Sequence, residues 1–254
     1  MARALAIKIP KTAGELFFCS KGQQSAEGLA GETGGSVLPF PTEWNDPDVV
    51  ILCLKPQQFS ELAVILKPKL KPSTLVISVL AGVSTERLQK ELNHENLVRL
   101  MPNLGATVSA GLITAYISST QNPRAQREIC ESLFKASNQF VWVLEEDMIT
   151  ASTPHTASTP ALFFELARLL ALDLEKRGFE PLEARSMIIE TMYGSSLLMK
   201  NSHLPLAELR DSVTSKKGVT AEMLDSLYKD QLSDLLTRAL ELAVKKSFDL
   251  GQNS

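Results

Sequence analysis

The sequence contains few cysteines and few histidines, which limits the chemistry that its side chains can support. Three of each occur among 254 residues. Cys19, Cys53 and Cys130 are odd in number, widely separated, and set in apolar or helical surroundings, so we do not expect a disulfide framework. The histidines show no spacing typical of a metal site. A reducing cytoplasm is the expected compartment, and no metal ion is expected.

The sequence also lacks an excess of one charge and any long apolar run. Its 26 basic and 29 acidic residues give a net charge of −3, so no strong field favours nucleic acid or an anionic membrane. No apolar run reaches the length of a membrane span, and the opening MARALAIKIPK is too short and too interrupted for a signal peptide. With 44% hydrophobic residues, the chain can bury the core of one large or two modest domains. We expect a soluble protein whose partners are small molecules or protein subunits.

Apolar strands alternate with predicted helices over the first 145 residues. The clearest strand is DVVILCLK at 48–55, which is followed by a helix over 57–68 and a second buried strand over 74–80. The other predicted elements are helices at 1–9, 25–32, 84–92 and 123–136, a buried strand at 14–20, and strands at 36–38, 96–101, 111–118 and 139–144. This alternation predicts an α/β layer with a largely parallel, doubly wound sheet.

Beyond Glu145 the pattern becomes purely helical, and we place a domain boundary near Asp147. The predicted domains are an α/β domain over residues 1–147 and an all-helical domain over residues 148–254. The predicted helices have long apolar faces, which include Leu169, Met187 and Leu197. Together these faces are larger than one short helical layer usually buries. Two interpretations stay open, namely a monomeric bundle core and burial shared with a second subunit.

A polar turn, TSKKGVT, interrupts the helical half between residues 214 and 220. Apolar residues recur at helical spacing on both sides of it, so the break is local. Gly218 allows backbone conformations that other residues resist, and Thr220 lies where the next helix begins. The N–H groups at such a helix start attract anions, and a carboxylate is the natural small one. An ordinary helix–helix connection with a threonine cap is the alternative interpretation.

The segment ELRDSVTSKKGVTAEMLDSL resembles the signature of pyrroline-5-carboxylate reductases. Four other stretches occur in the order typical of that family, namely VVILCLKPQ, VISVLAGVS, LVRLMPNLGATVSAG and EEDMITASTPHTASTPA. The resemblance extends from Met1 to about Gly251. It implies a Rossmann-like dinucleotide-binding domain followed by an all-α dimerisation domain, in homodimers or rings of dimers.

The resemblance implies NAD(P)H-dependent reduction of 1-pyrroline-5-carboxylate to L-proline, a step of proline biosynthesis. Reduction of a cyclic imine needs transfer of a hydride to carbon and of a proton to nitrogen, and the protein has to bind the substrate carboxylate. The turn would hold that carboxylate through Ser215 and through the backbone N–H groups of Gly218, Val219 and Thr220. We assign the catalytic role to Thr220, whose hydroxyl would position the imine nitrogen and relay a proton from water.

Polar residues after the predicted strands indicate where the cofactor binds. An NAD-specific domain usually has Asp or Glu after its second strand, whereas GELFFCSKGQQ has Ser20 and Lys21 there, which suit the 2′-phosphate of NADP. NADPH is therefore the expected cofactor, with NADH as the alternative. The family places further cofactor contacts after the next strands, and the corresponding residues are Lys55, Pro56, Ala81 and Asn103. On spacing alone, Lys21 and Asn103 would be ordinary turn residues.

The usual opening of a dinucleotide-binding domain, a strand followed by G-x-G and a helix, is absent from this sequence. MARAL resembles the family's sequence from the methionine that follows the glycine turn. Because the first strand normally lies in the middle of the sheet, its loss would leave neighbouring strands without partners. We expect the 254-residue sequence to begin downstream of the natural start and, in this form, to bind NADPH poorly. The alternative is a protein that has lost its main pyrophosphate site.

The sequence departs from the family pattern at two places. These departures leave open the alternative that the chain is a non-catalytic, reductase-like binding or regulatory protein. Lys216 and Lys217 stand where the family often has Pro-Gly or Lys-Gly, so Lys217 takes the place of a glycine. In PHTASTPA at 154–161, Pro154, Ala157 and Thr159 take the place of three more glycines. A homologous imine oxidoreductase and a 3-hydroxyacid oxidoreductase are weaker competitors. The latter normally needs a catalytic lysine in its helical half, and none can be identified there.

Overall fold

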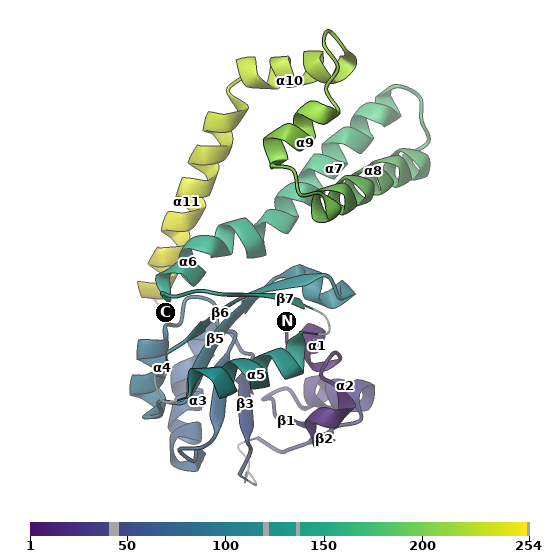
Figure 1. Ribbon diagram of the computed structural model, residues 1–254. Helices are drawn as coiled ribbons and strands as arrows, with labels where there is room; N and C mark the ends of the chain where they lie inside the picture. Colours follow the sequence, from purple (N-terminus) through teal and green to yellow (C-terminus); the bar gives the residue numbers. More distant parts are fainter. Residues whose placement is uncertain (41–45, 119–121, 136–137, 253–254) are drawn as a thin grey trace. The chain divides into compact units, whose positions relative to one another are not determined.

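The structure, a computed structural model, describes residues 1–40, 46–118, 122–135 and 138–252. By their contacts the residues group into two compact units. The first is Met1–Ala157 together with Ala243–Ser254, and the second is Ser158–Leu242. Figure 1 shows the elements of both units, labelled in chain order. The boundary at Asp147 stays a prediction.

Strands and helices alternate in the first unit, as the sequence predicts. The strands are β1 (Phe17–Phe18), β2 (Ser36–Val37), β3 (Val49–Leu52), β4 (Leu75–Ser78), β5 (Leu97–Pro102), β6 (Gly111–Ile117) and β7 (Asn138–Trp142). The helices are α1 (Ala2–Ala6), α2 (Gln23–Thr33), α3 (Phe59–Leu66), α4 (Thr85–Leu92), α5 (Pro123–Phe134) and α6 (Asp147–Thr153), with short 3₁₀ turns η1 (Lys11–Ala13), η2 (Pro56–Gln58), η3 (Lys67–Lys69) and η4 (Leu104–Val108). Capping residues start two of the helices, because the Ser84 hydroxyl accepts from the Arg87 N–H and the Asn122 side chain accepts from the Ala125 N–H.

The described strands form two sheets. β1 and β2 pair in parallel, while the larger sheet has the order β3-β4-β5-β6-β7. β3, β4 and β5 are parallel to one another, β6 runs antiparallel to β5, and β7 is parallel to β6. The predicted α/β class with a largely parallel sheet is therefore confirmed. Within the described residues β1 does not pair with β3, so β3 forms an edge of the larger sheet.

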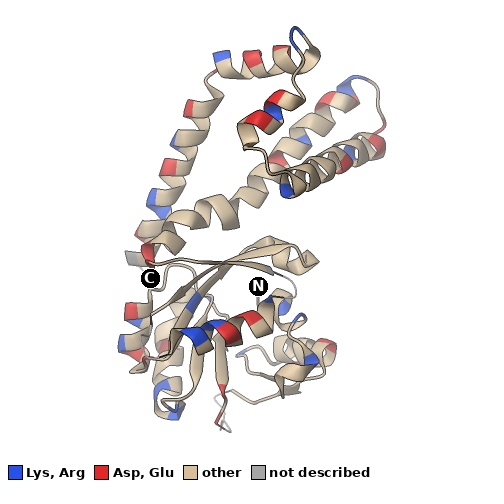
Figure 2. Cartoon of the chain, viewed as in Figure 1, with Lys and Arg blue, Asp and Glu red and all other residues tan. Residues whose placement is uncertain are grey.

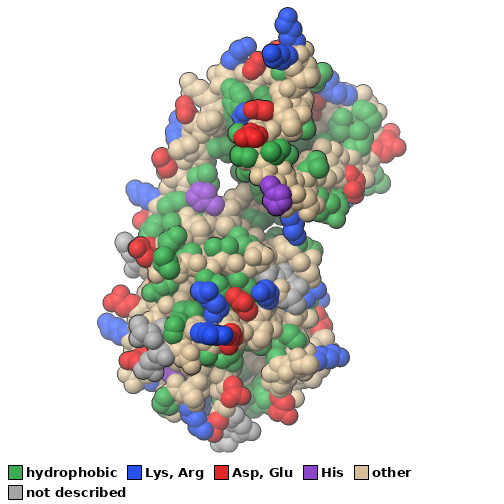
Figure 3. All heavy atoms as spheres, in the orientation of Figure 1, with side chains coloured by type: hydrophobic (Ala, Val, Ile, Leu, Met, Phe, Trp, Pro, Cys, Tyr) green, Lys and Arg blue, Asp and Glu red, His purple; other side chains and the backbone are tan. Residues whose placement is uncertain are grey.

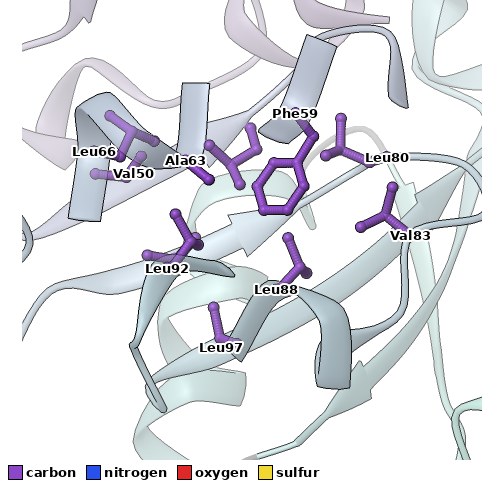
Figure 4. Close-up of a cluster of buried hydrophobic side chains, with 11 residues drawn as sticks. Val50, Phe59, Ala63, Leu66, Leu80, Val83, Leu88, Leu92 and Leu97 are labelled. Atoms are coloured by element: carbon purple, nitrogen blue, oxygen red, sulfur yellow. The ribbon is translucent and has the colours of Figure 1, made fainter. Parts of the chain in front are cut away.

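Two hydrophobic cores cover opposite faces of the larger sheet. Side chains of β3 and β4 pack on one face against α3 and α4, with Phe59 and Leu88 completely buried among them (Figure 4). The other face carries α1 and α5, through Leu5 and Phe134, against side chains of β4, β5 and β6. Neighbouring residues of β4 divide between the two cores, Val76 in one and Ile77 in the other, because successive side chains of a strand point to opposite faces. The sheet is therefore doubly wound, as predicted.

The N-terminal elements are shorter than the sequence predicts. The strand expected at 14–20 comprises only Phe17 and Phe18, and Phe17 is 49% exposed, so the prediction of a buried strand was wrong. A two-stranded sheet offers few neighbours for its side chains to bury against. The first helix ends at Ala6 rather than at Ile9, since a residue that precedes a proline disfavours the helical conformation.

The second unit is purely helical. Its helices are α7 (Thr159–Lys176), α8 (Pro181–Asn201), α9 (Leu206–Ser212), α10 (Val219–Lys229) and the first part of α11 (Leu232–Gln252), whose last residues belong to the first unit. α7 packs against α8, and Gly178 makes the turn between them with a φ of +96°, which favours glycine. The expectation of no strand after Met148 is confirmed for the described residues.

Charged side chains are interspersed along the helices of both units (Figure 2). This distribution agrees with the small net charge of −3. Across the described ranges, every helix is either too short or too polar to cross a membrane.

Candidate functional site

Three predicted cofactor residues lie at one edge of the larger sheet. Because β3, β4 and β5 are parallel, Lys55, Ala81 and Asn103, which follow them, lie beyond the carboxyl ends of neighbouring strands. Open α/β sheets bind their ligands at this edge. Lys55 and Ala81 are exposed and Asn103 is half-buried, so a cation, a small residue and an amide are available there. This set of groups fits a dinucleotide.

The turns at this edge have definite causes in the sequence. β3 ends at Leu52, and Pro56 begins the short 3₁₀ turn η2 directly after Lys55. Gly82, which follows Ala81, has a φ of +74°, and a Cβ atom there would lie 3.2 Å from the backbone of Leu250 at the end of α11. The backbone of α11 therefore approaches the cofactor edge closely within the first unit. Sequence analysis missed this contact, since no local pattern links residues so far apart.

The proposed 2′-phosphate residues lie after β1, in the smaller sheet. The Ser20 hydroxyl accepts a hydrogen bond from the Gly22 N–H just before α2, and both Ser20 and Lys21 are exposed. The Lys21 ammonium forms an ion pair of 2.5 Å with Glu61, a residue of α3. Glu61 was not predicted from the sequence. It holds the lysine in place, and it would also compete with a bound phosphate for that cation.

The predicted substrate turn has a well-defined geometry in the second unit. The Gly218 N–H donates to the Ser215 carbonyl at 3.0 Å, which closes a four-residue turn, and α10 begins at Val219. A Cβ atom on Gly218 would lie 2.2 Å from the Ser215 Oγ, so a side chain there would have to displace that hydroxyl. The sequence-based expectation that the Gly218 N–H faces the ligand needs correction, since that group is already bonded. The N–H groups of Val219 and Thr220 lie in the first helical turn, where a helix has no internal acceptors for them.

Comparisons with known proteins agree with these two regions of the chain. Residues 146–250 match the family described as pyrroline-5-carboxylate reductase dimerisation, and residues 1–82 match the family described as NADP oxidoreductase, coenzyme F420-dependent. A pyrroline-5-carboxylate reductase of Vibrio alginolyticus is 32% identical over 209 residues, which is 81% of this chain and 76% of the relative. That of Pseudomonas aeruginosa is 31% identical over 233 residues, which is 91% of this chain and 85% of the relative. This chain belongs to the pyrroline-5-carboxylate reductase family.

The solved structures agree with this assignment. The structure of a pyrroline-5-carboxylate reductase from Coxiella burnetii is 25% identical and matches with a TM-score of 0.88, covering 98% of this chain and 94% of that one. The resemblance seen in the sequence motifs is thus confirmed. So is the fold, a Rossmann-like domain followed by a helical dimerisation domain.

Both predicted departures from the reductase family have visible structural consequences. Lys217, which takes the place of a family glycine, adopts a φ of +60°, a left-handed conformation that costs a side-chain-bearing residue about 1–2 kcal/mol. The segment Pro154–Ser158, where two more glycines are replaced, forms a single π-helical turn between α6 and α7. Such turns are often found at functional sites. Lys217 therefore adopts a left-handed backbone conformation that usually favours glycine.

Sequence analysis also missed a buried ion pair where the reductase dimerisation region begins. Arg99 of β5 is 3% exposed, and its Nη1 donates to Glu146 at 2.7 Å. The same carboxylate accepts the backbone N–H and the hydroxyl of Thr85, the first residue of α4. This contact ties β5, α4 and the start of α6 together. An arginine inside an otherwise apolar strand was the available signal.

Within the described ranges, the thiols and the other potential metal ligands form no further centre. Burial raises the pKa of Cys53 to about 11 and that of Cys130 to about 12, so both stay protonated at neutral pH. All three cysteines are free. In the part of the chain that the structure describes, His, Cys, Asp and Glu residues form no group that could hold a metal ion.

Proposed function

We propose that this chain reduces 1-pyrroline-5-carboxylate to L-proline with a nicotinamide cofactor. One observation carries the proposal: the turn at 215–218 keeps the close glycine geometry at the start of α10, in a chain whose relatives are pyrroline-5-carboxylate reductases. A carboxylate suits the N–H groups and the positive end of an 11-residue helix.

The substrate-binding residues in this proposal are Ser215, Gly218, Val219 and Thr220. Val219 and Thr220 would donate their N–H groups to the carboxylate, and the Ser215 hydroxyl would add a further donor. Gly218 contributes by leaving space, because its own N–H is bonded to the Ser215 carbonyl. The half-buried Thr220 hydroxyl would hold the imine nitrogen and pass it a proton from water, since a threonine is too weak an acid to supply that proton itself.

The cofactor-binding residues in this proposal are Ser20, Lys21, Lys55, Pro56, Ala81 and Asn103. When bound, the dihydronicotinamide supplies the hydride. Lys21 and Ser20 would meet a 2′-phosphate, so we propose NADPH as the preferred cofactor, with NADH as the alternative. Lys55 is an exposed cation at the carboxyl edge, where it would meet the charged part of the dinucleotide.

We further propose that two chains pair through their helical halves and place the substrate turn of one subunit against the cofactor domain of the other. Large apolar side chains exposed on α7 and α8 support this pairing, as does the dimerisation family that residues 146–250 match. The assembly would be a homodimer or a ring of dimers. The reaction would take place in the cytoplasm, where the free thiols found here are stable.

Steady-state turnover of 1-pyrroline-5-carboxylate with NADPH and with NADH tests the proposal. We expect turnover with NADPH, a smaller kcat/KM with NADH, and proline as the product. In Thr220→Val we expect kcat to fall about 100-fold, because proton transfer from a positioned group contributes 10²–10⁴-fold. Thr220→Ser should retain most of the activity, and Thr237→Val on α11 is the matched control. Absence of turnover with either nicotinamide would favour the non-catalytic alternative.

A further inference from the structure

The end of α11 lies against the loop that joins β4 to α4, residues 79–84, within the first unit. A Cβ atom on Gly82 would lie 3.2 Å from the carbonyl carbon and oxygen of Leu250, and one on Gly251 would lie 3.3 Å from the Gly82 oxygen. These distances are shorter than ordinary van der Waals contact, so a side chain at either position would push the two segments apart. Two glycines that are far apart in the sequence therefore allow a direct approach of backbone to backbone.

Hydrogen bonds hold the same loop at its far end. The Glu146 carboxylate, just before α6, accepts the N–H and the hydroxyl of Thr85, the residue that follows the loop. The Ser247 hydroxyl of α11 donates to the Thr150 carbonyl of α6 at 3.0 Å, and Figure 1 shows these two segments side by side. The loop is thus held at two points, by α11 and by the start of α6, and these two helices are bonded to each other.

The same two helices lie where the chain enters and leaves the helical unit. The chain passes between the units after Ala157 and after Leu242. α6 and the π-helical turn precede the first of these points, and α11 contains the second. The loop after β4 is therefore in contact with both segments that join the first unit to the second.

The loop also lies at the ligand edge of the sheet. β4 is flanked by β3 and β5, which are parallel to it, and the loops beyond the carboxyl ends of such strands contact ligands. Ala81, one of the proposed cofactor residues, is exposed and directly precedes Gly82. Glycine has few steric limits of its own, so the backbone at Gly82 is fixed by its surroundings. Beyond its chain neighbours, the three atoms nearest to a Cβ on Gly82 all belong to α11, so α11 restricts this backbone most closely.

We propose that the end of α11 positions the β4–α4 loop for the cofactor, with Gly251 as the positioning residue on α11 and Gly82 as its partner in the loop. This inference rests on the cofactor part of the proposed function and adds a coupling between cofactor binding and the segments that lead to the helical unit. Such a coupling is reciprocal. α11 strengthens cofactor binding, and a bound cofactor stabilises the end of α11 to the same extent.

Three glycine-to-alanine substitutions separate this contact from backbone strain. Gly82→Ala adds a Cβ against α11 at a φ of +74°. Gly34→Ala adds one at a φ of +77°, where nothing lies within 4 Å, and is the matched control. Gly251→Ala adds a Cβ against the Gly82 oxygen from the side of α11, where alanine favours the helix more than glycine does, so fraying of α11 is not introduced.

The measurements are the dissociation constant of NADPH, the thermal unfolding midpoint, and amide hydrogen exchange of residues 247–251 with and without NADPH. For Gly82→Ala and Gly251→Ala we expect NADPH affinity to fall at least about 5-fold, the lower end of typical coupling effects. Gly34→Ala should leave the affinity unchanged, and Gly251→Ala should leave the midpoint unchanged. The double variant of Gly82 and Gly251 should lose less than the product of the two single losses, because both changes disturb one contact. NADPH should slow exchange at residues 247–251 in the unaltered chain and in Gly34→Ala, and less so in Gly251→Ala.

Unchanged NADPH affinity in Gly251→Ala would overturn the inference, even if Gly82→Ala were too unstable to measure. Equal losses in Gly34→Ala and Gly251→Ala would overturn it too, since a substitution without a contact would then act alike. Exchange at residues 247–251 that does not respond to NADPH in the unaltered chain would also overturn it. Protection of α11 by NADPH without turnover of 1-pyrroline-5-carboxylate would sustain the inference and defeat the proposed reaction, whereas turnover without such protection would do the reverse.

Discussion

The two units of this protein bury their apolar side chains in different ways. The first unit has two closed cores in which residues such as Phe59, Leu88 and Phe134 are completely buried. In the second unit, among the described residues, Ala184 is the one buried hydrophobic side chain. Helices α7 and α8 expose Phe163, Phe164, Leu169, Leu170 and many others, and hydrophobic side chains are visible at their surface in Figure 3.

This difference shows that the first unit completes its hydrophobic core within one chain, whereas the second unit does not. A sheet covered by helices on both faces completes its core within one chain. A few helices with apolar residues on several sides leave large apolar area exposed to water, which monomeric proteins rarely do. The family match to a dimerisation region over residues 146–250 agrees with this contrast.

Charges placed on the exposed apolar face of α7 should have the largest effect. In the double variant Phe163→Glu with Leu170→Glu we expect the dissociation constant of the dimer to rise at least about 100-fold, since each buried aromatic or leucine side chain contributes about 1.5–3 kcal/mol. Sedimentation velocity would measure the change. Leu144→Glu, at an exposed leucine of the first unit, is the control. A double variant that still forms dimers would show that this face of α7 is not the interface.

A methyl group at Gly218 should be the next most damaging change. In Gly218→Ala the new Cβ would lie 2.2 Å from the Ser215 Oγ and displace that hydroxyl. We expect kcat/KM to fall about 100-fold, which is typical of a substrate-binding group that is misplaced by about 1 Å. Gly28→Ala, where a Cβ meets nothing within 4 Å, is the control. In a Ser215→Ala background the loss should be much smaller, and a full loss there would exclude displacement of the hydroxyl as the cause.

Alkaline pH should destabilise the first unit selectively. The folded-state pKa values of Cys53 and Cys130, about 11 and about 12, lie above the ordinary value of 9.0. The unfolded chain therefore loses these protons first, and stability present below pH 9 decreases as the pH rises toward 11 and 12. Each buried thiol should cost about 1.4 kcal/mol per pH unit in that window.

Tryptophan fluorescence during denaturant unfolding would measure this loss, because Trp142 lies in β7 of the first unit. Replacing Cys53 and Cys130 with alanine should flatten the dependence on pH. An equally steep decline in that double variant would assign the effect to other groups.

Loss of the Lys21 cation should have the smallest effect. In Lys21→Ala we expect the dissociation constant for NADPH to rise about 10-fold, as for one charge-assisted hydrogen bond of about 1.5 kcal/mol at an exposed position. The constant for NADH should change little, since NADH has no 2′-phosphate. Glu61→Gln removes the competing carboxylate and should strengthen NADPH binding slightly. Equal losses for both cofactors in Lys21→Ala would argue against a phosphate contact.

The sequence alone determined the order of the elements and the positions of the candidate site. Runs such as 49–54 and 75–77 are apolar without alternation because a doubly covered sheet buries both sides of a strand. Lys55, Ala81 and Asn103 could be placed at one edge because parallel strands all end on the same side. The substrate turn could be recognised because its residues are consecutive, so that local conformation and chemistry are read together.

The tertiary structure decided which of these groups are available to bind. Glu61 is 40 residues from Lys21, and Leu250 approaches the backbone of Gly82, yet no sequence pattern relates either pair. The bond from the Gly218 N–H to the Ser215 carbonyl depends on backbone geometry that residue types alone do not specify. Hydrophobic periodicity is a local property, whereas hydrogen-bond partners and ion pairs follow from how distant segments meet in the folded chain.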